Sequence, residues 1–586
     1  MFKIFKYLKT KEWLMICISL VFIVASVWLD LRLPEFMAVI TKLIQTEGSA
    51  MSEIWLNGGY MLLCALGSLA MVIAVGFLAA KIGASFSQRL RSELYNKVDT
   101  FSMGDINKFS TASLITRSTN DISQIQLVVT MGLQMVVKAP ILAVWAILKI
   151  AGKGFEWTLA TGVAVTSVVL TFSLIIILVT PKFKKMQTLT DNINRVTREN
   201  LTGLPVVRAY NAEAYQEAKF EKVNNELTNT ALYTSRAMAI LLPVIGLVIN
   251  VMSLVIYWIG AILINNAGAA VRLDLFSNMV VFSSYALQIL LAFMMMTILF
   301  ILLPRAQVSA KRINEVLDTE PTIKDGTISE GAAGQQGEVE FRNVSFKYPG
   351  AAAYVLQDVS FSAHKGETIA IIGSTGSGKS TLMNLIPRFY DTTEGTVLID
   401  GVDVKDYKLA SLYNKIGHIP QKAIMFSGTV TSNVAFDENG TDDAREDDVK
   451  NAVRIAQGTD FVEKMDDTYN APITRSGTNV SGGQKQRLSI ARAVCKKPEI
   501  YIFDDSFSAL DYKTDRMLRT TLKREAQGVT SLIVAQRIGT IMDADKIIVL
   551  DEGKVVGVGK HKELLKTCSV YREIAMSQLS EEELVV

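Results

Sequence analysis

Apolar residues dominate the first three hundred positions of the chain, in runs longer than the core helix of a water-soluble protein needs. Six of these runs reach about 20 residues, the length that crosses a bilayer as an α-helix. They lie near residues 13–33, 56–80, 125–150, 157–180, 237–265 and 276–303. The pattern predicts a membrane α-helical domain of six transmembrane helices.

Two long polar segments, residues 81–124 and 181–236, separate these runs and carry most of the lysines and arginines of this half. The loops on the opposite side hold little beyond Lys42, Lys153 and Arg272. The positive-inside rule therefore predicts that both termini and both long segments lie in the cytoplasm. Spans two to five should then continue as long helical extensions past the lipid.

The pattern changes after about residue 303, and residues 319–337 are rich in Gly, Ala and Gln, as in a linker. Beyond it, short apolar runs alternate with helical segments, which predicts an α/β domain with buried parallel strands. We expect a transmembrane domain at 1–318, a linker at 319–337, the α/β domain at 338–578 and a tail at 579–586.

Composition narrows the possible functions. The formal net charge is +3, and no clustered basic face suggests nucleic-acid binding. The four cysteines have no C-x-x-C spacing and the three histidines no ligand pattern, which disfavours a disulfide framework or a zinc site. Partners are therefore expected among lipids and small molecules rather than nucleic acids.

The strand-like run ETIAIIG leads directly into GSTGSGKST, which matches the phosphate-loop pattern G-x-x-x-x-G-K-[ST] before a helix. Backbone N–H groups of such a loop surround phosphate oxygens, a lysine supplies a positive charge, and a hydroxyl binds Mg²⁺. The predicted nucleotide-binding residues are Gly373, Ser374, Thr375, Gly376, Ser377, Gly378, Lys379, Ser380 and Thr381.

Two further motifs accompany the loop. The strand IYIFD ends at Asp504, which is placed to join Ser380 in holding Mg²⁺. The stretch VSGGQKQRLSIARA puts a glycine pair at the start of a helix, a second anion site in one chain. Its Ser481, Gly482, Gly483 and Gln484 are best explained as serving a nucleotide held by another copy of the domain.

With these motifs the chain resembles the ATP-binding cassette (ABC) family, and specifically an ABC exporter half-transporter. SGGQ matches the family signature, and the motif order continues from Tyr348 through Gln421 to SALD at 508–511. The resemblance implies that Tyr348 stacks on adenine, that Gln421 reaches Mg²⁺ and the attacking water, and that Asp511 contacts the opposite subunit. Segments 114–126 and 199–213 are similar to exporter loops that carry short coupling helices.

The chain departs from the family at two hydrolytic positions. Asp505 replaces the glutamate that polarises the attacking water, and Gln536 replaces the switch histidine. The lost methylene shortens the reach by about 1.5 Å, and a misplacement of roughly 1 Å can cost on the order of a hundredfold in rate. Glutamine, unlike histidine, cannot become cationic near neutral pH. Before the signature, Arg475, Ser476 and Gly477 stand where exporters usually have Glu-Arg-Gly.

These departures favour a subunit of a heterodimeric, ATP-driven exporter of the multidrug type, with a weak ATP site in this chain. Its expected cofactors are ATP and Mg²⁺. Its expected partners are the lipid bilayer, a hydrophobic or amphipathic compound, and a second half-transporter with an intact catalytic Glu and His, in the cytoplasmic membrane. The alternatives are a homodimeric slow exporter of lipid or peptide, and a nucleotide-gated regulator or channel.

Two features of the membrane half each allow two interpretations. Lys138 interrupts the third apolar run and either lines the transport pathway or extends its stem toward the membrane surface. The run FMMMT at 293–297 either contacts an apolar cargo or simply packs against neighbouring helices.

Overall fold

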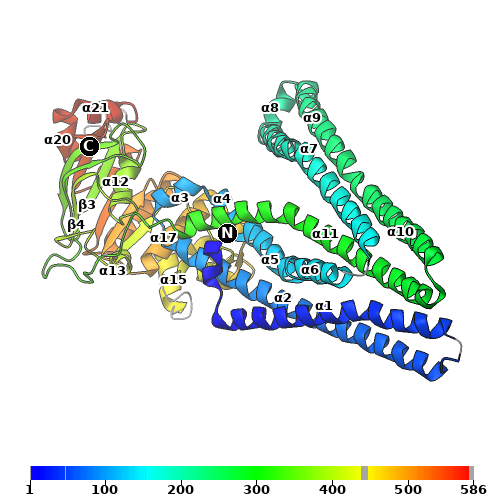
Figure 1. Cartoon of the computed structure of the whole chain (residues 1–586). Helices are drawn as coiled ribbons and strands as arrows, with labels where there is room; N and C mark the ends of the chain where they lie inside the picture. The colour runs from blue at the N-terminus through cyan, green and yellow to red at the C-terminus, as the bar shows by residue number, and fades with distance from the viewer. Residues whose placement is uncertain (1, 47, 152–153, 437–445, 580–586) are drawn as a thin grey trace. The chain divides into compact units, whose positions relative to one another are not determined.

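The computed structural model describes residues 2–46, 48–151, 154–436 and 446–579. The chain divides into two compact units. Unit 1 comprises Met1–Asp99 and Ala112–Thr319, and unit 2 comprises Thr100–Thr111 and Glu320–Val586. Figure 1 shows unit 1 as long helices and unit 2 as a mixture of helices and strands.

Every regular element among the described residues of unit 1 is a helix. Its α-helices are α1 (Thr10–Gln45), α2 (Met51–Asp99), α4 (Thr111–Thr116), α5 (Ile122–Met131), α6 (Lys138–Ile150), α7 (Phe155–Thr202), α8 (Leu204–Ala209), α9 (Glu213–Ala239), α10 (Leu241–Asn266) and α11 (Ala269–Leu317). Six helical stretches of the described chain are long and apolar enough to cross a membrane. The predicted six-span helical domain is therefore confirmed.

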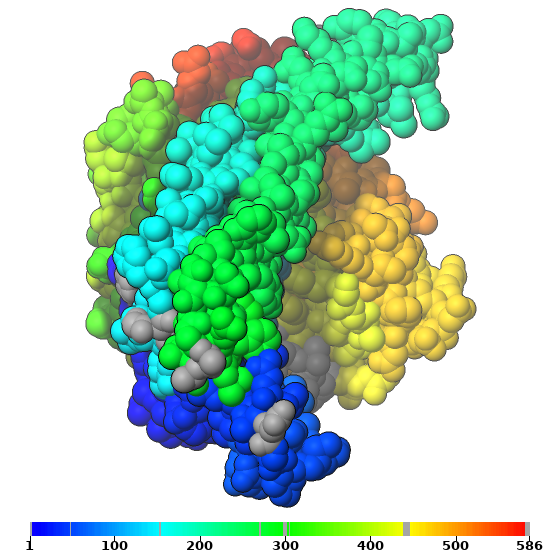
Figure 2. Space-filling view, turned by 45° about the vertical axis from the view of Figure 1, so that its right-hand side comes forward, coloured from blue at the N-terminus to red at the C-terminus, as the bar shows by residue number. Residues whose placement is uncertain are grey.

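The longest helices extend well beyond a bilayer. α2 has 49 residues and α7 has 48, and at 1.5 Å per residue each is about 70 Å long, more than twice the roughly 30 Å hydrocarbon core. Figure 2 shows α7 (cyan) running beside the α9–α10 segment (teal to green), with which it packs. The predicted helical extensions are thus present.

The first helix is longer than the predicted span 13–33 and contains all of it. α1 continues to Gln45, whereas the apolar run ends near residue 33. The charged residues beyond that point are paired: Glu35 accepts hydrogen bonds from Arg32 over 2.6 Å and from Lys149 over 2.6 Å, and Lys42 forms an ion pair with Asp274. Because these charges neutralise one another, the helix can continue past them.

Unit 2 contains two main sheets. The antiparallel sheet has the order β2-β1-β4-β5, and the larger sheet has the order β12-β11-β3-β10-β9-β6, in which all pairs except β11–β12 are parallel. The strands are β1 (Val339–Phe346), β2 (Leu356–Ala363), β3 (Thr368–Gly373), β4 (Glu394–Ile399), β5 (Val402–Asp403), β6 (Ile416–Ile419), β9 (Ile500–Asp504), β10 (Thr530–Val534), β11 (Lys546–Asp551) and β12 (Lys554–Gly559). The predicted α/β domain is confirmed.

Helices surround these sheets. They are α12 (Lys379–Leu385), α13 (Leu409–Lys415), α14 (Val430–Val434), α15 (Glu446–Ile455), α16 (Thr459–Val462), α17 (Gly482–Cys495), α18 (Tyr512–Glu525), α19 (Ile538–Ile541), α20 (His561–Thr567) and α21 (Ser569–Met576). The short strands β7 (Gly428–Thr429) and β8 (Pro472–Ile473) form a separate pair. Two apolar cores result, one containing Phe503 and Leu488, the other Phe341 and Leu382.

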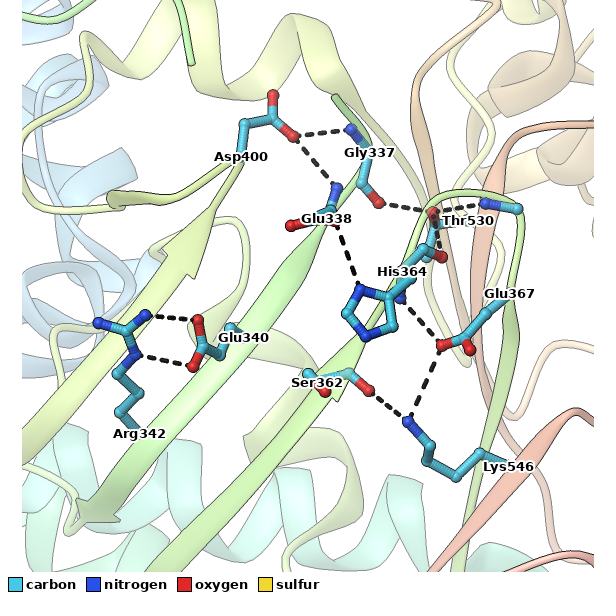
Figure 3. Close-up of polar contacts among 11 residues, drawn as sticks. Gly337, Glu338, Glu340, Arg342, Ser362, His364, Glu367, Asp400, Thr530 and Lys546 are labelled. Carbon is cyan, nitrogen blue, oxygen red and sulfur yellow. Dashed lines mark hydrogen bonds and ion pairs between the residues drawn. The ribbon is translucent and has the colours of Figure 1, made fainter. Parts of the chain in front are cut away.

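The Gly-rich segment before β1 is anchored to unit 2. Gly337 donates its N–H to Asp400 Oδ1 over 2.7 Å, and its carbonyl accepts from Thr530 Oγ1 over 2.5 Å (Figure 3). Gly331 passes so close to Asp400 that an added Cβ would lie 2.3 Å from the Asp400 Cβ. Residues with linker-like composition therefore lie against the sheet here, because glycine permits close backbone approach.

A short helix, α3 (Met103–Phe109), belongs to unit 2 although the sequence assigned its residues to the transmembrane domain. Ser102 and Asp105 form a reciprocal cap at its start. Asp105 Oδ2 also accepts from both the N–H and the hydroxyl of Thr322, each over 3.1 Å. These bonds attach the segment to unit 2.

The two segments expected to carry short coupling helices differ in outcome. Segment 199–213 contains the short helix α8, as expected. Segment 114–126 instead continues the helical chain through the π-helical turn η2 (Arg117–Asp121), and the separate short helix is α3, before it. The signal for α3 is the capping pattern Ser102-x-x-Asp105, which sequence reasoning missed.

Candidate ATP-binding site

The phosphate loop joins the end of β3 to the start of α12, as the sequence predicts. Gly376 and Gly378 have φ values of 87° and 96°, which favour glycine over residues with a Cβ. An added Cβ on Gly373 would lie 2.1 Å from the Leu550 carbonyl oxygen. The loop's glycines thus allow a tight turn whose backbone N–H groups can face an anion.

Lys379 lies within this loop. Its Nζ donates to the carbonyl oxygens of Gly373 over 2.9 Å and of Ser374 over 2.6 Å. Burial lowers the pKa of Lys379, and the nearby carboxylates of Asp504 and Asp505 partly oppose that shift. The ammonium is therefore held where phosphate oxygens would approach the loop.

Ser380 and Asp504 meet at the end of β9. The Ser380 hydroxyl donates to Asp504 Oδ1 over 2.8 Å. Burial raises the pKa of Asp504, and the neighbouring Asp505 adds to that shift, while the Ser380 hydrogen bond opposes it. A hydroxyl and a carboxylate beside the phosphate loop are oxygen ligands that Mg²⁺ accepts, so these residues fit the predicted metal.

Asp505 adopts a left-handed backbone conformation, with φ of 48°. Its Oδ2 accepts hydrogen bonds from Gln536 Nε2 over 2.8 Å and from Gln421 Nε2 over 3.3 Å. Burial raises the pKa of Asp505, and the Gln421 hydrogen bond opposes that shift. Asp505 and Gln536 are thus in direct contact.

Tyr348 lies on the adjoining side of unit 2. Its hydroxyl is 2.9 Å from Thr381 Oγ1, and its ring packs edge-on against Phe346 and Tyr390. A cavity of about 1130 Å³ opens beside it, lined also by Asn107 of α3. The exposed part of an aromatic ring next to a phosphate loop can stack on a nucleotide base.

Two family matches cover most of the chain. Residues 356–508 match the ABC transporter family, and residues 16–293 match the ABC transporter transmembrane region. The chain belongs to the ABC transporter family. It joins one membrane region to one ATP-binding domain and is therefore a half-transporter.

Three relatives illustrate the similarity. An uncharacterized ABC transporter ATP-binding protein of Mycobacterium tuberculosis is 40% identical over 523 residues, 89% of this chain and 87% of that protein. The Bacillus subtilis ABC transporter ATP-binding protein YfiB, also uncharacterized, is 36% identical, with 90% of each chain covered. The ATP-dependent lipid A-core flippase of Pseudomonas fluorescens is 31% identical, with 85% and 81% covered.

A solved structure shares the fold. It is a bacterial Atm1-family ABC exporter with ATP bound, with a TM-score of 0.81 and 23% sequence identity, covering 97% of this chain and 99% of that chain. The transporter therefore has the fold of an ABC exporter.

The transporter's signature residues form the start of α17. Ser481 Oγ accepts from the Gln484 N–H over 3.3 Å, and Gln484 Oε1 accepts from the Ser481 N–H over 2.8 Å. Ser481 and Gly482 are exposed, and an added Cβ on Gly482 would meet no atom of the described residues within 4 Å. This free helix start is available to an anion from outside the chain.

Asp511 caps the following helix of the transporter. It accepts from the Thr514 N–H over 2.9 Å and from the Thr514 hydroxyl over 2.7 Å. These hydrogen bonds hold the pKa of Asp511 below its usual range. Within the described residues the side chain therefore stabilises α18, and a contact with an opposite subunit stays a prediction.

Arg475, Ser476 and Gly477 form a short 3₁₀ turn before the signature. Ser476 and Gly477 both have positive φ, 59° and 62°. An added Cβ on Gly477 would lie 3.1 Å from the Met425 side chain. The glycine is thus needed for the turn that leads into the signature.

Proposed function

We propose that this chain is one subunit of a heterodimeric ATP-driven exporter and that its own phosphate loop forms an ATP site of low hydrolytic activity. The observation that carries the proposal is the pair of amide hydrogen bonds on Asp505 Oδ2, from Gln536 and Gln421. The carboxylate is one methylene shorter than glutamate and is already engaged by two donors. It is therefore poorly placed to take a proton from an attacking water.

Gln536 strengthens this proposal. Its amide donates to Asp505 at every pH, whereas a histidine at this position could carry a positive charge or exchange a proton near neutral pH. Phosphoryl transfer depends on groups that orient the nucleophile and stabilise developing charge. At this site Asp505 and Gln536 stand in the places of the catalytic glutamate and the switch histidine. Both residues bind more readily than they catalyse.

The remaining residues suit ATP binding. Tyr348 would stack on adenine, and Lys379 and the loop N–H groups would bind the phosphates. Ser380 and Asp504 would hold Mg²⁺, with Gln421 beside them, and the ion would neutralise phosphate charge. ATP kept at this site would hold the two cassettes together, since a ligand stabilises the state that binds it more tightly.

The partner subunit completes the mechanism. Ser481, Gly482, Gly483 and Gln484 would cap ATP bound to a second half-transporter that retains the catalytic Glu and His, and Asp511 would contact that subunit. Hydrolysis there would loosen the clamp and change the membrane conformation. The signature of this chain would thus serve the active ATP site, and its own phosphate loop would form the weak ATP site.

The proposed cargo is a hydrophobic or amphipathic compound moved out of the cell across the cytoplasmic membrane, with unit 2 in the cytoplasm. The lysines and arginines of the long polar segments support this orientation. A relative named as a lipid A-core flippase supports a lipid-like amphiphile over a hydrophilic solute. The mostly apolar spans suit the same class, including multidrug-type substrates.

The decisive test separates the two ATP sites. The full-length chain is purified alone and with its partner, and ATP turnover is measured for Asp505→Asn and for Gly482→Asp in this chain. We expect little turnover by the chain alone, paired activity that survives Asp505→Asn, and paired activity that is lost in Gly482→Asp.

Two matched controls accompany these variants. Asp466→Asn removes a different carboxylate, which is exposed, and Gly539→Asp changes an exposed glycine whose added Cβ would also meet no described atom within 4 Å. Both should leave activity unchanged. A stable ATPase formed by this chain alone and lost in Asp505→Asn would overturn the heterodimer proposal and favour a homodimeric slow exporter, for which the retained carboxylate of Asp505 is the supporting observation.

A further inference from the structure

Four helices of unit 1 bring polar side chains together around Asp30. Lys138 Nζ donates to Asp30 Oδ2 over 3.0 Å, and Ser68 Oγ donates to Asp30 Oδ1 over 2.5 Å. Gln288 Nε2 lies 3.5 Å from the Asp30 carbonyl oxygen. These four residues, from α1, α2, α6 and α11, are called the polar cluster.

Three members of the polar cluster stand near the middle of their apolar runs, and Asp30 stands near the end of the run 13–33, inside the longer helix α1. Ser68, Lys138 and Gln288 each stand near the centre of an apolar run, 56–80, 125–150 and 276–303. At least twelve residues, about 18 Å of helix, separate Lys138 from either end of its run, more than a lysine side chain can reach. Along its own helix Lys138 is therefore far from both ends of its apolar run, and the side chain pairs with Asp30.

The polar cluster retains hydrogen-bonding capacity. The side chains of Lys138 and Asp30 are 19% and 27% exposed, so a ligand can reach both. A lysine ammonium has three donors, and in the described residues its one ion-pair partner is Asp30. Gln288 Oε1 is buried without a hydrogen-bond partner in the described part of the chain. A buried acceptor of this kind is uncommon unless a ligand or water reaches it.

The helix that carries Lys138 is irregular at this depth. The π-helical turn η3 (Gly132–Val136) ends two residues before Lys138, and Pro140 cannot donate a backbone hydrogen bond to the Val136 carbonyl. Such turns in a long helix are frequent at functional sites. A functional role is also the default expectation for ionisable residues inside a membrane.

We propose that the polar cluster binds a zwitterionic group of the transported amphiphile, with the ligand's cation at Asp30 and its anion at Lys138. This inference rests on the proposed export function. A ligand with a single charge could pair with only one of the two residues and would leave the other charge unpaired in the membrane. Unpaired charges are costly there, whereas a zwitterion replaces one ion pair by two and adds no net charge.

The test measures binding to the full-length chain in maltoside micelles without nucleotide. The probes share a ten-carbon chain: decylphosphocholine and a decyl carboxybetaine as zwitterions, decyltrimethylammonium, decyl phosphate, and decanol. Microscale thermophoresis supplies each Kd. We expect both zwitterions, or one of them, to bind at least tenfold more tightly than the singly charged and neutral probes. Preference for the phosphocholine indicates a phospholipid-like head group, and preference for the betaine indicates a carboxylate.

Variants then assign the binding to the pair. Asp30→Asn and Lys138→Met should each weaken zwitterion binding at least tenfold. The double variant Asp30→Lys with Lys138→Asp keeps an ion pair and should recover most of the binding, which also covers the case in which a single variant fails to fold. Lys149→Met is the matched control, because Lys149 is on the same helix and its partner Glu35 still has Arg32 as an ion-pair partner. The Kd of this variant for the zwitterions should stay within twofold of that of the unmodified chain.

Three results would overturn the inference: decyl phosphate or decyltrimethylammonium binding as tightly as the zwitterions, equal binding of decanol, or unchanged binding in Lys138→Met. Failure of the proposed export function looks different. In that case zwitterion binding persists and depends on Asp30 and Lys138, while ATP drives no transport in vesicles.

Discussion

Gln536 donates a hydrogen bond from Nε2 to Oδ2 of Asp505 over 2.8 Å, although the two residues are 31 positions apart in the chain. β10 and β9 are neighbouring parallel strands, with Val534 opposite Asp504. The residues that follow them therefore meet at one edge of the sheet. This contact places Asp505 and Gln536 in a single site.

The contact predicts that the two positions act together. We expect Asp505→Glu with Gln536→His to raise the ATP turnover of this chain's own site by at least about tenfold, since a correctly placed base contributes on the order of 10² or more in rate. Each single substitution should raise the turnover by less than half of that gain on a logarithmic scale. The free-energy effects of substitutions at two residues in contact are not additive. Turnover is measured at saturating ATP, with the partner's catalytic Glu changed to Gln. A double variant no faster than the unmodified chain would contradict this prediction.

Tyr348 should determine the affinity for the adenine base. Stacking of a base on an aromatic ring is worth roughly 1–3 kcal/mol, so Tyr348→Ala should weaken ATP binding by about tenfold or more. Tyr348→Phe removes only the hydroxyl that lies 2.9 Å from Thr381 Oγ1 and is the matched control, with a Kd close to that of the unmodified chain. Binding is measured by fluorescence titration with a labelled ATP. Equal loss in both variants would show that the hydroxyl, and not stacking, matters.

Asp105 should hold residues 100–111 on unit 2. Its carboxylate accepts from Ser102 and Thr322, and these hydrogen bonds outweigh the opposing effect of burial and lower the pKa of Asp105. Loss of a cap and its hydrogen bonds costs about 1–3 kcal/mol. Asp105→Ala should therefore speed amide exchange in this segment by about tenfold or more.

Hydrogen-exchange mass spectrometry of the full-length chain measures this effect. The exposed Asp99 just before the segment supplies the control, and Asp99→Ala should leave the exchange of residues 100–111 unchanged. Equal protection in Asp105→Ala and the unmodified chain would mean that other contacts hold α3.

His418 should make unit 2 less stable in mild acid. Burial lowers the pKa of His418 from 6.5 to about 4, so the unfolded chain binds a proton at this residue as the pH falls below 6.5, whereas the folded chain does so only near pH 4. The free energy of unfolding therefore decreases over this window. At pH 5 the loss from this group is about 2 kcal/mol.

The unfolding temperature of the full-length chain, measured between pH 7.5 and 5, checks the effect of His418. The side chain packs edge-on against Phe389, and His418→Gln keeps a polar side chain that does not titrate. The variant should lose less stability on acidification than the unmodified chain. The same acid sensitivity in both would assign the effect to other groups.

Local patterns were enough to predict both halves of the fold. Long apolar runs identify membrane helices because a lipid-crossing helix must be about 20 residues long, and the loop GSTGSGKST identifies the phosphate site because glycines and a lysine are needed at fixed spacing. The continuation of α1 to Gln45 goes beyond the predicted span, and the sequence does not show that Arg32, Glu35 and Lys149 pair there. α3 was missed because its attachment depends on Thr322, more than 200 residues away.

The sequence by itself determined the family resemblance, the six apolar spans and the phosphate-loop motif, and it predicts that Asp505 and Gln536 stand at hydrolytic positions. Only the tertiary structure showed that Asp505 is bonded to Gln536 and Gln421, and that Lys138 pairs with Asp30, 108 residues before it. The physical reason is that periodicity and motif spacing report interactions within one helix, strand or loop. Which side chains of different elements meet depends on how the sheet and the helices pack.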